Sequence, residues 1–304
     1  MPNQDDGINR RDFLHRAAGA ALSGSAIAAG SGVAMGAEAA SGDKVIWRNR
    51  KPGMTYRRLG RTDLMCSRLA AGWRGNNRLK AMLIEKGVNY LDTSRNYAGG
   101  QNEKEIAPLV KKYRDRLFLS SKASGLAGYP RLSFKPGEGA KAARMYTELL
   151  DTSLEELKVD HVDCYYLHGV AKPFVLETQE LYAAYEKAHK AGKVKHYGFT
   201  THANVGEVLA KAVEVEAKGD VKYDLIMVAC KPTSWDGLKD SITQLRKRDI
   251  GVICMKGTGR VGESGQPRIA EMLKVANIDI ARRTVTKYRE SMNMLSSTKR
   301  RQVG

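Results

Sequence analysis

Several features are scarce in this sequence of 304 residues. Every apolar stretch long enough to cross a bilayer is interrupted by Gly or Ser, so we expect no retained membrane span. The 4 cysteines, Cys66, Cys164, Cys230 and Cys254, show no C-x-x-C spacing. Each lies in or beside an apolar run, which favours small buried core residues over metal ligands or disulfides. We identify no set of metal-ligating residues.

Acidic side chains are also scarce, with 33 Asp and Glu against 51 Lys and Arg, for a formal charge of +18. The excess divides into about −1 for residues 1–40, +13 for 41–265 and +6 for 266–304. Such charge is compatible with nucleic acid, a membrane surface or an anionic cofactor. A composition of 42% apolar and 28% charged residues excludes a disordered or fibrous chain.

The first forty residues have three parts. A basic stretch, Asn9-Arg10-Arg11-Asp12-Phe13-Leu14-His15-Arg16, precedes a weakly apolar Ala-rich stretch and then Ala37-Glu38-Ala39. This layout resembles a twin-arginine signal peptide. The resemblance implies that residues 1–40 engage the twin-arginine export machinery, and that the product is periplasmic or otherwise exported. The chain would be cytoplasmic if the signal is not used, and a disordered Ala/Gly arm is the alternative interpretation.

Short β-forming runs alternate with amphipathic helical patterns from residue 55 onward, which predicts a parallel sheet covered by helices. Seven such runs suit a (β/α)8 TIM-type barrel over residues 41–262 better than a doubly wound sheet. The barrel would be incomplete, because no eighth strand is recognisable after Gly262. The expected strands are Ser67–Trp73, Asn89–Thr93, Arg116–Ser121, Val162–His168, Lys195–Thr201, Asp224–Cys230 and Ile250–Met255.

Four polar side chains stand at the ends of consecutive expected strands: Asp92, Tyr97, Lys122 and His168. In a TIM-type barrel the chemistry lies at this rim. A tyrosine beside Lys and His can act as a general acid, and the cation is expected to lower the pKa of Tyr97 toward the working range. Asp92 would keep Lys122 charged and in place. Each residue alone has an ordinary structural explanation, such as a turn or a surface position.

Residues 54–259 resemble the aldo-keto reductase family. The opening Met54-Thr55-Tyr56-Arg57-Arg58-Leu59-Gly60-Arg61-Thr62 matches, Asp92 and Tyr97 have the family's spacing, and Lys122 and His168 complete its tetrad. Further matches are Ser153–Leu157, Asp163–His168 and Gly192-Lys193-Val194 before Gly198. The resemblance implies reduction of a small aldehyde or ketone by NADPH (or NADH), with Tyr97 protonating the carbonyl oxygen.

The residues aligned with the family's cofactor contacts depart from its pattern. Thr200 and Thr201 replace a Ser-Asn pair, Met255 replaces the aromatic that stacks on nicotinamide, and Lys256 could attract phosphate. Met227 replaces a Gln. The run Gly257-x-Gly259-x-x-Gly262 follows a strand but opens no helix, so a loop is favoured over a dinucleotide fingerprint.

The tail, residues 263–304, has the pattern of two short helices around a turn, typical of a helix-turn-helix. Its second helix offers Arg282, Arg283, Lys287 and Arg289 to DNA. Residues 267–304, and above all Ala281–Glu290, resemble the RpoN box of the sigma-54 factors. That resemblance implies sequence-specific DNA binding as an alternative function, although a solvated basic helix would also carry such charge.

An exported reductase and a DNA-binding protein are conflicting predictions, because an exported chain does not meet the chromosome. The reductase interpretation covers more of the chain and includes the whole tetrad. A composite, catalytically impaired chain, in which a reductase has lost its last strand and gained a sigma-factor end, would reconcile the two.

Overall fold

A computed structural model of the chain describes residues 45–230 and 234–255. Six parallel strands form one sheet whose spatial order, β3-β4-β5-β6-β7-β8, is also their order in the sequence. They span Tyr90–Asp92, Phe118–Ala123, Val162–Leu167, Val194–Thr201, Leu225–Ala229 and Gly251–Met255. A strand order without jumps, with a helix in each crossover, is the winding of a TIM-type barrel. The described sheet is therefore a TIM-like half-barrel, which confirms the predicted fold class.

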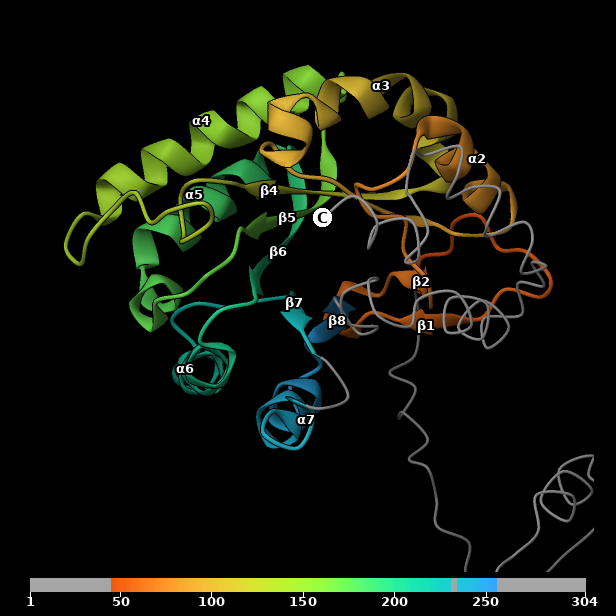
Figure 1. The fold of residues 1–304 in the computed structure, drawn as a ribbon. Helices are drawn as coiled ribbons and strands as arrows, with labels where there is room; N and C mark the ends of the chain where they lie inside the picture. Colours follow the sequence, from red (N-terminus) through yellow and green to blue (C-terminus); the bar gives the residue numbers. More distant parts are fainter. Residues whose placement is uncertain (1–44, 231–233, 256–304) are drawn as a thin grey trace, which may run out of the picture. The chain divides into compact units, whose positions relative to one another are not determined.

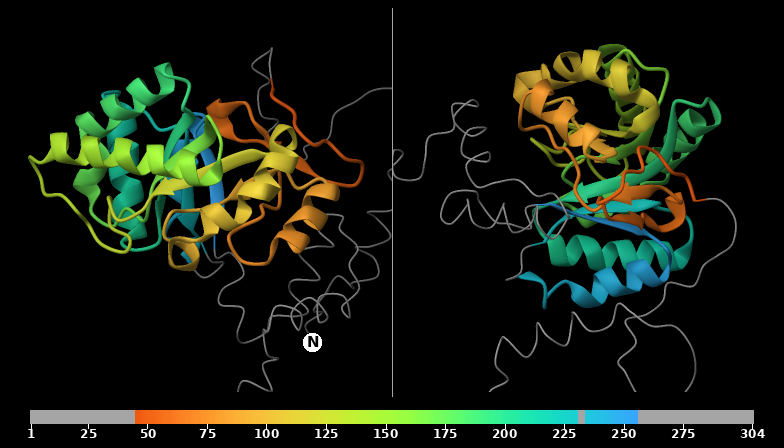
Figure 2. Two further views of the ribbon diagram at one scale, coloured as in Figure 1. Left: turned by 90° about the horizontal axis from the view of Figure 1, so that it is seen from above. Right: turned by 90° about the vertical axis from the view of Figure 1, so that its right-hand side faces the viewer.

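The helices lie outside this sheet (Figure 1). Figure 2 shows α6 and α7 on one side of the strands and α2, α3 and α4 on the other, as expected for helices that wrap around a curved sheet. The helices span Asn77–Glu85 (α2), Asn102–Tyr113 (α3), Gly139–Leu157 (α4), Gln179–Lys190 (α5), Val205–Lys218 (α6) and Lys239–Lys247 (α7). Short 3₁₀ turns cover Gly60–Thr62 (η1), Tyr97–Gly100 (η2), Arg114–Arg116 (η3) and Pro173–Glu177 (η4).

The strand expected over residues 67–73 is wrong in its position. Met65–Ser67 (β2) forms an antiparallel hairpin with Tyr56–Arg58 (β1), and residues 68–73 form no strand. Only Ala71 reaches the sheet, through its N–H to the Tyr90 carbonyl and its carbonyl to the Asp92 N–H, both 2.8 Å. After this bridge the backbone turns away from its contact with β3, and residues 72–76 connect it to α2. The other six expected strands are confirmed within a few residues of their ends.

Each strand has an inner and an outer face, and each face has its own core. The outer faces pack against the amphipathic helices: on α4, for example, Ala142, Tyr146 and Leu150 lie one turn apart and Leu157 two turns further on, and all four are inaccessible to solvent. The inner faces contribute a smaller cluster that also contains residues of the β1–β2 hairpin. Its members are Leu59, Leu64, Cys66, Tyr90, Phe118, Cys164, Tyr166, Leu225 and Met227. The hairpin and η1 therefore cover the inner face at its amino-terminal end, which leaves the carboxyl end for the polar residues.

The cysteine prediction holds for three residues and is wrong for one. Cys66, Cys164 and Cys230 are buried, whereas Cys254 is exposed. Cys254 lies on β8, and its thiol donates to the Cys230 carbonyl of the segment after β7 at 3.2 Å. Within 45–230 and 234–255, no helix combines the length and apolar character that a membrane crossing requires.

Candidate active site

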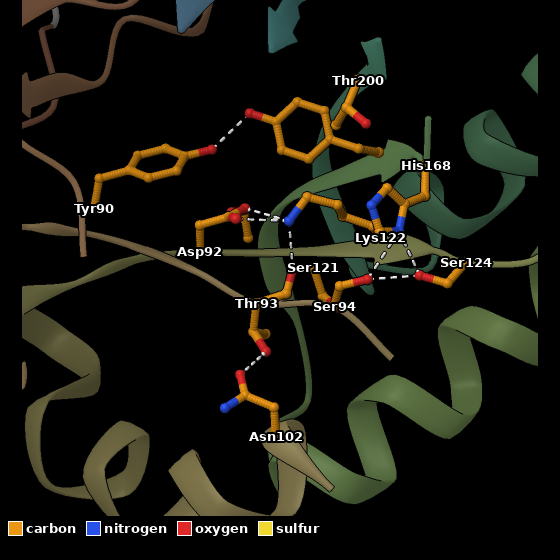
Figure 3. A network of polar contacts seen from close by, with 12 residues as sticks. Tyr90, Asp92, Thr93, Ser94, Asn102, Ser121, Lys122, Ser124, His168 and Thr200 are labelled. Atoms are coloured by element: carbon orange, nitrogen blue, oxygen red, sulfur yellow. Dashed lines mark hydrogen bonds and ion pairs between the residues drawn. The ribbon is translucent and has the colours of Figure 1, made fainter. Parts of the chain in front are cut away.

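Three neighbouring strands bring the four predicted residues of the tetrad together. Asp92 is the last residue of β3, Lys122 lies near the end of β4, His168 follows β5 directly, and Tyr97 begins η2 in the loop after β3. Parallel strands end at the same edge, so these side chains converge on the carboxyl rim of the half-barrel (Figure 3).

Lys122 and Asp92 form a buried ion pair. The Lys122 Nζ donates to both Asp92 carboxylate oxygens, at 2.7 and 2.6 Å, and to the Thr93 carbonyl at 2.6 Å. The Ser120 hydroxyl donates to the same carboxylate at 2.8 Å. Burial lowers the pKa of Lys122, and the Asp92 carboxylate opposes this shift. All three ammonium hydrogens are thus used within the site, which fixes the position of the charge.

Tyr97 is held by aromatic contacts. Its ring stacks on Trp73 at 5.4 Å between centroids, meets the His168 ring edge-on at 5.8 Å, and lies 4.8 Å from the Lys122 Nζ. Burial, with the Asp92 charge and Tyr129 adding to it, raises the pKa of the Tyr97 hydroxyl. The expected lowering is therefore wrong for the described structure: the loss of water and the nearby carboxylate outweigh the ammonium. Tyr97 keeps its proton at working pH.

His168 is almost fully buried, at 4% exposure, and its Nδ1 contacts two hydroxyls. The Ser124 Oγ lies 2.6 Å from Nδ1 and the Ser94 Oγ 3.0 Å from it. Burial, the Lys122 charge and His202 together lower the pKa of His168 to about 2. His168 is consequently a neutral ring and can offer a hydrogen bond but not a charge. The Tyr129 ring lies 4.9 Å from it and completes the aromatic rim.

The two predicted cofactor threonines lie on opposite faces of β6. Thr200 is on the inner face, near His168 and the inner core, and its Oγ accepts the Gly169 N–H at 2.8 Å, which leaves its own hydrogen for a further acceptor. Thr201 is wholly buried on the outer face, where its hydroxyl donates to the Val170 carbonyl at 2.8 Å. The structure therefore brings Thr200, but not Thr201, to the site.

Of the remaining predicted site residues, only Met255 lies within the described part of the chain. Met255 ends β8 and packs, partly buried, against the inner core cluster. Lys256, the DNA-contact candidates Arg282, Arg283, Lys287 and Arg289, and the signal sequence lie outside the described residues. Among the residues that the structure describes, no group of three or more His, Cys, Asp or Glu side chains could hold a metal ion.

Sequence reasoning assigned no role to Trp73, Ser94, Ser124 or Tyr129, which surround the tetrad. One sequence signal could have indicated Ser124. It lies two residues after Lys122, and residues two apart in an extended segment point to the same face. Tyr129 belongs to the loop between β4 and α4, and no periodic pattern predicts where such a loop packs.

Fold and site together define a class. A parallel half-barrel with helices outside, and Asp, Tyr, Lys and His gathered at its carboxyl rim, is a TIM-type α/β protein with a polar site at the end of the barrel where such proteins carry their chemistry.

Comparison with known families gives the membership. The family model described as "Aldo/keto reductase family" matches residues 75–262, so the chain belongs to the aldo/keto reductases. A second model, "Sigma-54, DNA binding domain", matches residues 263–302. The tail is thus similar to that domain over 263–302, as its resemblance to the RpoN box predicted.

Individual relatives are distant and matched in part. The uncharacterized oxidoreductase YqkF of Bacillus subtilis is 30% identical over 158 residues, which is 49% of each chain. The chain spans about half the length, or less, of the curated relatives it matches. A putative aldo-keto reductase from Pseudomonas aeruginosa has a similar fold, with a TM-score of 0.56 at 20% identity, covering 74% of this chain and 85% of that one. An aldo/keto reductase from Klebsiella pneumoniae, solved with NADP and acetate, gives 0.52 at 20%, covering 74% and 76%.

Proposed function

We propose that this chain reduces an aldehyde or ketone, with NADPH or NADH supplying the hydride when bound and Tyr97 supplying the proton. The observation that carries the proposal is the convergence of Asp92, Tyr97, Lys122 and His168 on one rim. Membership of the aldo/keto reductase family supports it.

The described residues provide an inner face that suits a nicotinamide. Thr200 has a hydroxyl hydrogen free to meet a carboxamide oxygen, and Met227 and Met255 supply soft apolar surface on the neighbouring strands. We do not include Thr201 in this proposal, because its hydroxyl donates to the Val170 carbonyl on the far side of β6. We propose Thr200 and Met255 as the cofactor contacts within the described sheet, with Lys256 as a further phosphate contact.

The protein's own groups account for the proton transfer. Tyr97 stays protonated because it is shielded from water, so it can donate to a carbonyl oxygen that becomes basic as the carbonyl is reduced. The resulting phenolate would lie beside the fixed ammonium of Lys122, whose position over the ring is already set by Asp92 and Thr93. Neutral His168 presents a second polar group to the same oxygen without adding charge.

Tyr97→Phe tests this role, because it removes the hydroxyl but keeps the ring that stacks on Trp73. We expect kcat/KM for NADPH-dependent reduction of a small aldehyde to fall by about 10²-fold or more, the usual worth of a general acid. Quenching of Trp fluorescence by NADPH should persist. Tyr182→Phe, on the outward helix α5, is the matched control and should keep full turnover. Equal activity in both variants would overturn the assignment.

The tail supports a second candidate function, DNA binding, because residues 263–302 match a sigma-54 DNA-binding model. We expect the full chain to shift a duplex carrying a sigma-54-type promoter element, with an affinity that falls steeply as salt rises. Arg282→Ala with Arg283→Ala should abolish the shift. Arg268→Ala with Lys274→Ala removes the same charge outside the expected recognition helix and should weaken binding much less. Equal DNA binding by a chain that ends at Gly262 would show that the tail is not the DNA-binding segment.

A further inference from the structure

Two serines of unassigned role enclose the nitrogen of His168 that faces away from the reaction. Ser94 follows β3 by two residues and Ser124 follows β4 directly, and both are buried. Besides their contacts to Nδ1, the two Oγ atoms lie 2.5 Å apart. The Asn96 Oδ1 lies 3.0 Å from the first and 3.1 Å from the second. Figure 3 shows both hydroxyls below the ring of His168.

The contact lengths indicate the direction of these hydrogen bonds. Hydroxyl donors reach acceptors at about 2.5–3.0 Å, whereas N–H donors to oxygen lie at about 2.7–3.2 Å. The 2.6 Å contact between the Ser124 Oγ and Nδ1 therefore suits a hydroxyl that donates to the ring better than a ring that donates to oxygen. The 2.5 Å contact between the serines needs one hydroxyl to donate to the other. Hydrogen bonds that run from Ser94 to Ser124 and from Ser124 to Nδ1 satisfy both contacts. The reverse direction, from an Nδ1–H through Ser124 and Ser94 to the Asn96 Oδ1, would require an N–H···O bond of 2.6 Å, which is shorter than the usual range.

Burial and the neighbouring charges keep the His168 ring neutral. Loss of water disfavours an imidazolium most, the Lys122 ammonium and His202 add to this effect, and the rings of Tyr97 and Tyr129 cover two sides of the imidazole. A neutral imidazole carries one hydrogen, on either Nδ1 or Nε2. If the Ser124 hydroxyl occupies Nδ1 as a donor, the hydrogen must lie on Nε2.

We propose that Ser94 and Ser124 are positioning residues that hold His168 as the Nε2–H tautomer, so that the ring presents an N–H donor to the carbonyl oxygen that Tyr97 protonates. The proposal rests on the proposed reductase function for its consequence. The tautomer itself is a property of the free protein. The partner of one ring nitrogen generally decides which nitrogen carries the hydrogen.

Nitrogen-detected NMR of ¹⁵N-labelled full-length protein at pH 7 tests the tautomer directly. His168 is assigned by the loss of its signals in His168→Gln. We expect Nδ1 to resonate as an unprotonated nitrogen and Nε2 as a protonated one. In Ser94→Ala with Ser124→Ala, the two shifts should move toward each other as both tautomers become populated. Ser124→Thr keeps a hydroxyl at this position, so its Nδ1 and Nε2 shifts should stay separated as in the wild type.

Ser121→Ala is the matched control: Ser121 is fully buried on β4, three residues before Ser124, but its hydroxyl donates to Glu103 rather than to the ring. It should leave the His168 shifts unchanged. Loss of the hydrogen bonds in the double variant should lower kcat/KM for propanal about tenfold, with little change in KM for NADPH.

The outcomes separate the two proposals. A protonated Nδ1 in the wild type, or unchanged shifts in a double variant with a wild-type melting curve, would overturn the serine assignment. An Nε2–H ring in a protein that reduces no carbonyl would leave the serine assignment standing and remove the proposed function. If the double variant does not fold, Ser124→Ala alone should move the two shifts in the same direction by a smaller amount, because the Ser94 hydroxyl remains 3.0 Å from Nδ1; unchanged shifts would overturn the role of Ser124.

Discussion

At the scale of single residues, the ionisable side chains of the site are buried, and burial determines their protonation states. His168 illustrates the consequence for stability, because burial and the neighbouring Lys122 charge keep it neutral when folded. The unfolded chain binds a proton on this histidine below its ordinary pKa of about 6.5, and the folded chain does so only near pH 2. The unfolded state therefore binds more protons between these values, so stability falls as pH is lowered through that window.

We expect the free energy of unfolding to fall by up to about 1.4 kcal/mol per pH unit below pH 6 because of His168 alone. The His168→Gln variant should lack this component, so its pH dependence should be shallower. His161→Gln, at a partly exposed position, serves as the control and should follow the wild type. Urea unfolding at pH 7, 6 and 5 measures the slopes. Identical slopes for His168→Gln and the wild type would contradict the buried neutral ring.

At the scale of elements, Asp163 ties several segments to the amino-terminal end of the sheet. It is fully buried at the start of β5, lies 2.9 Å from the Arg114 guanidinium and 3.1 Å from that of Arg48, and accepts the Leu119 N–H of β4 at 2.9 Å. Burial acts to raise the pKa of Asp163, but Arg114 and Arg48 lower it overall. The carboxylate therefore joins η3, β4, β5 and the segment before β1.

We expect Asp163→Asn to lower the free energy of unfolding by about 3–5 kcal/mol, because it leaves two arginines without their buried partner. Asp151→Asn breaks the pair with Lys193, in which both side chains are largely exposed, and should cost at most about 1 kcal/mol. Denaturant unfolding at neutral pH gives both values. Comparable losses in the two variants would show that Asp163 does not anchor these elements.

The sequence predicts elements better than it predicts the surroundings of the site. Six strands follow from β-forming runs, and the tetrad follows from reading the ends of those strands. Residues 68–73 mislead because a short apolar run resembles a strand, whereas the strand itself is Met65–Ser67, which pairs with β1, and only Ala71 bridges to β3. The serines and Trp73 escape prediction because their contacts join loops that are distant in the sequence, and the Tyr97 pKa depends on burial that only the fold supplies.

At the scale of the whole molecule, three segments of different character share one chain. Export and DNA binding cannot both serve a mature product, whereas a reductase is compatible with either location. We propose that residues 1–40 direct twin-arginine export, which transports folded proteins.

Fusing residues 1–40 to a reporter that is active only after export tests this proposal. We expect periplasmic reporter activity, and its loss when Arg10→Lys and Arg11→Lys are combined, because the pathway reads the arginine pair rather than its charge. Arg16→Lys is the conservative control and should preserve export. A reporter that stays in the cytoplasm with the native pair would contradict the proposal and favour an unused arm.

Above all, we propose that this chain catalyses hydride transfer from a bound nicotinamide to a carbonyl carbon. The most direct measurement is a single turnover of the purified full-length chain with propanal and NADPH deuterated at the transferable position of the nicotinamide, followed by mass spectrometry of the alcohol. We predict propanol one mass unit heavier than the unlabelled product, formed at similar rates by the wild type and Tyr182→Phe and at least about 10²-fold more slowly by Tyr97→Phe. Propanol without deuterium, or no propanol from the wild type, would contradict the claim.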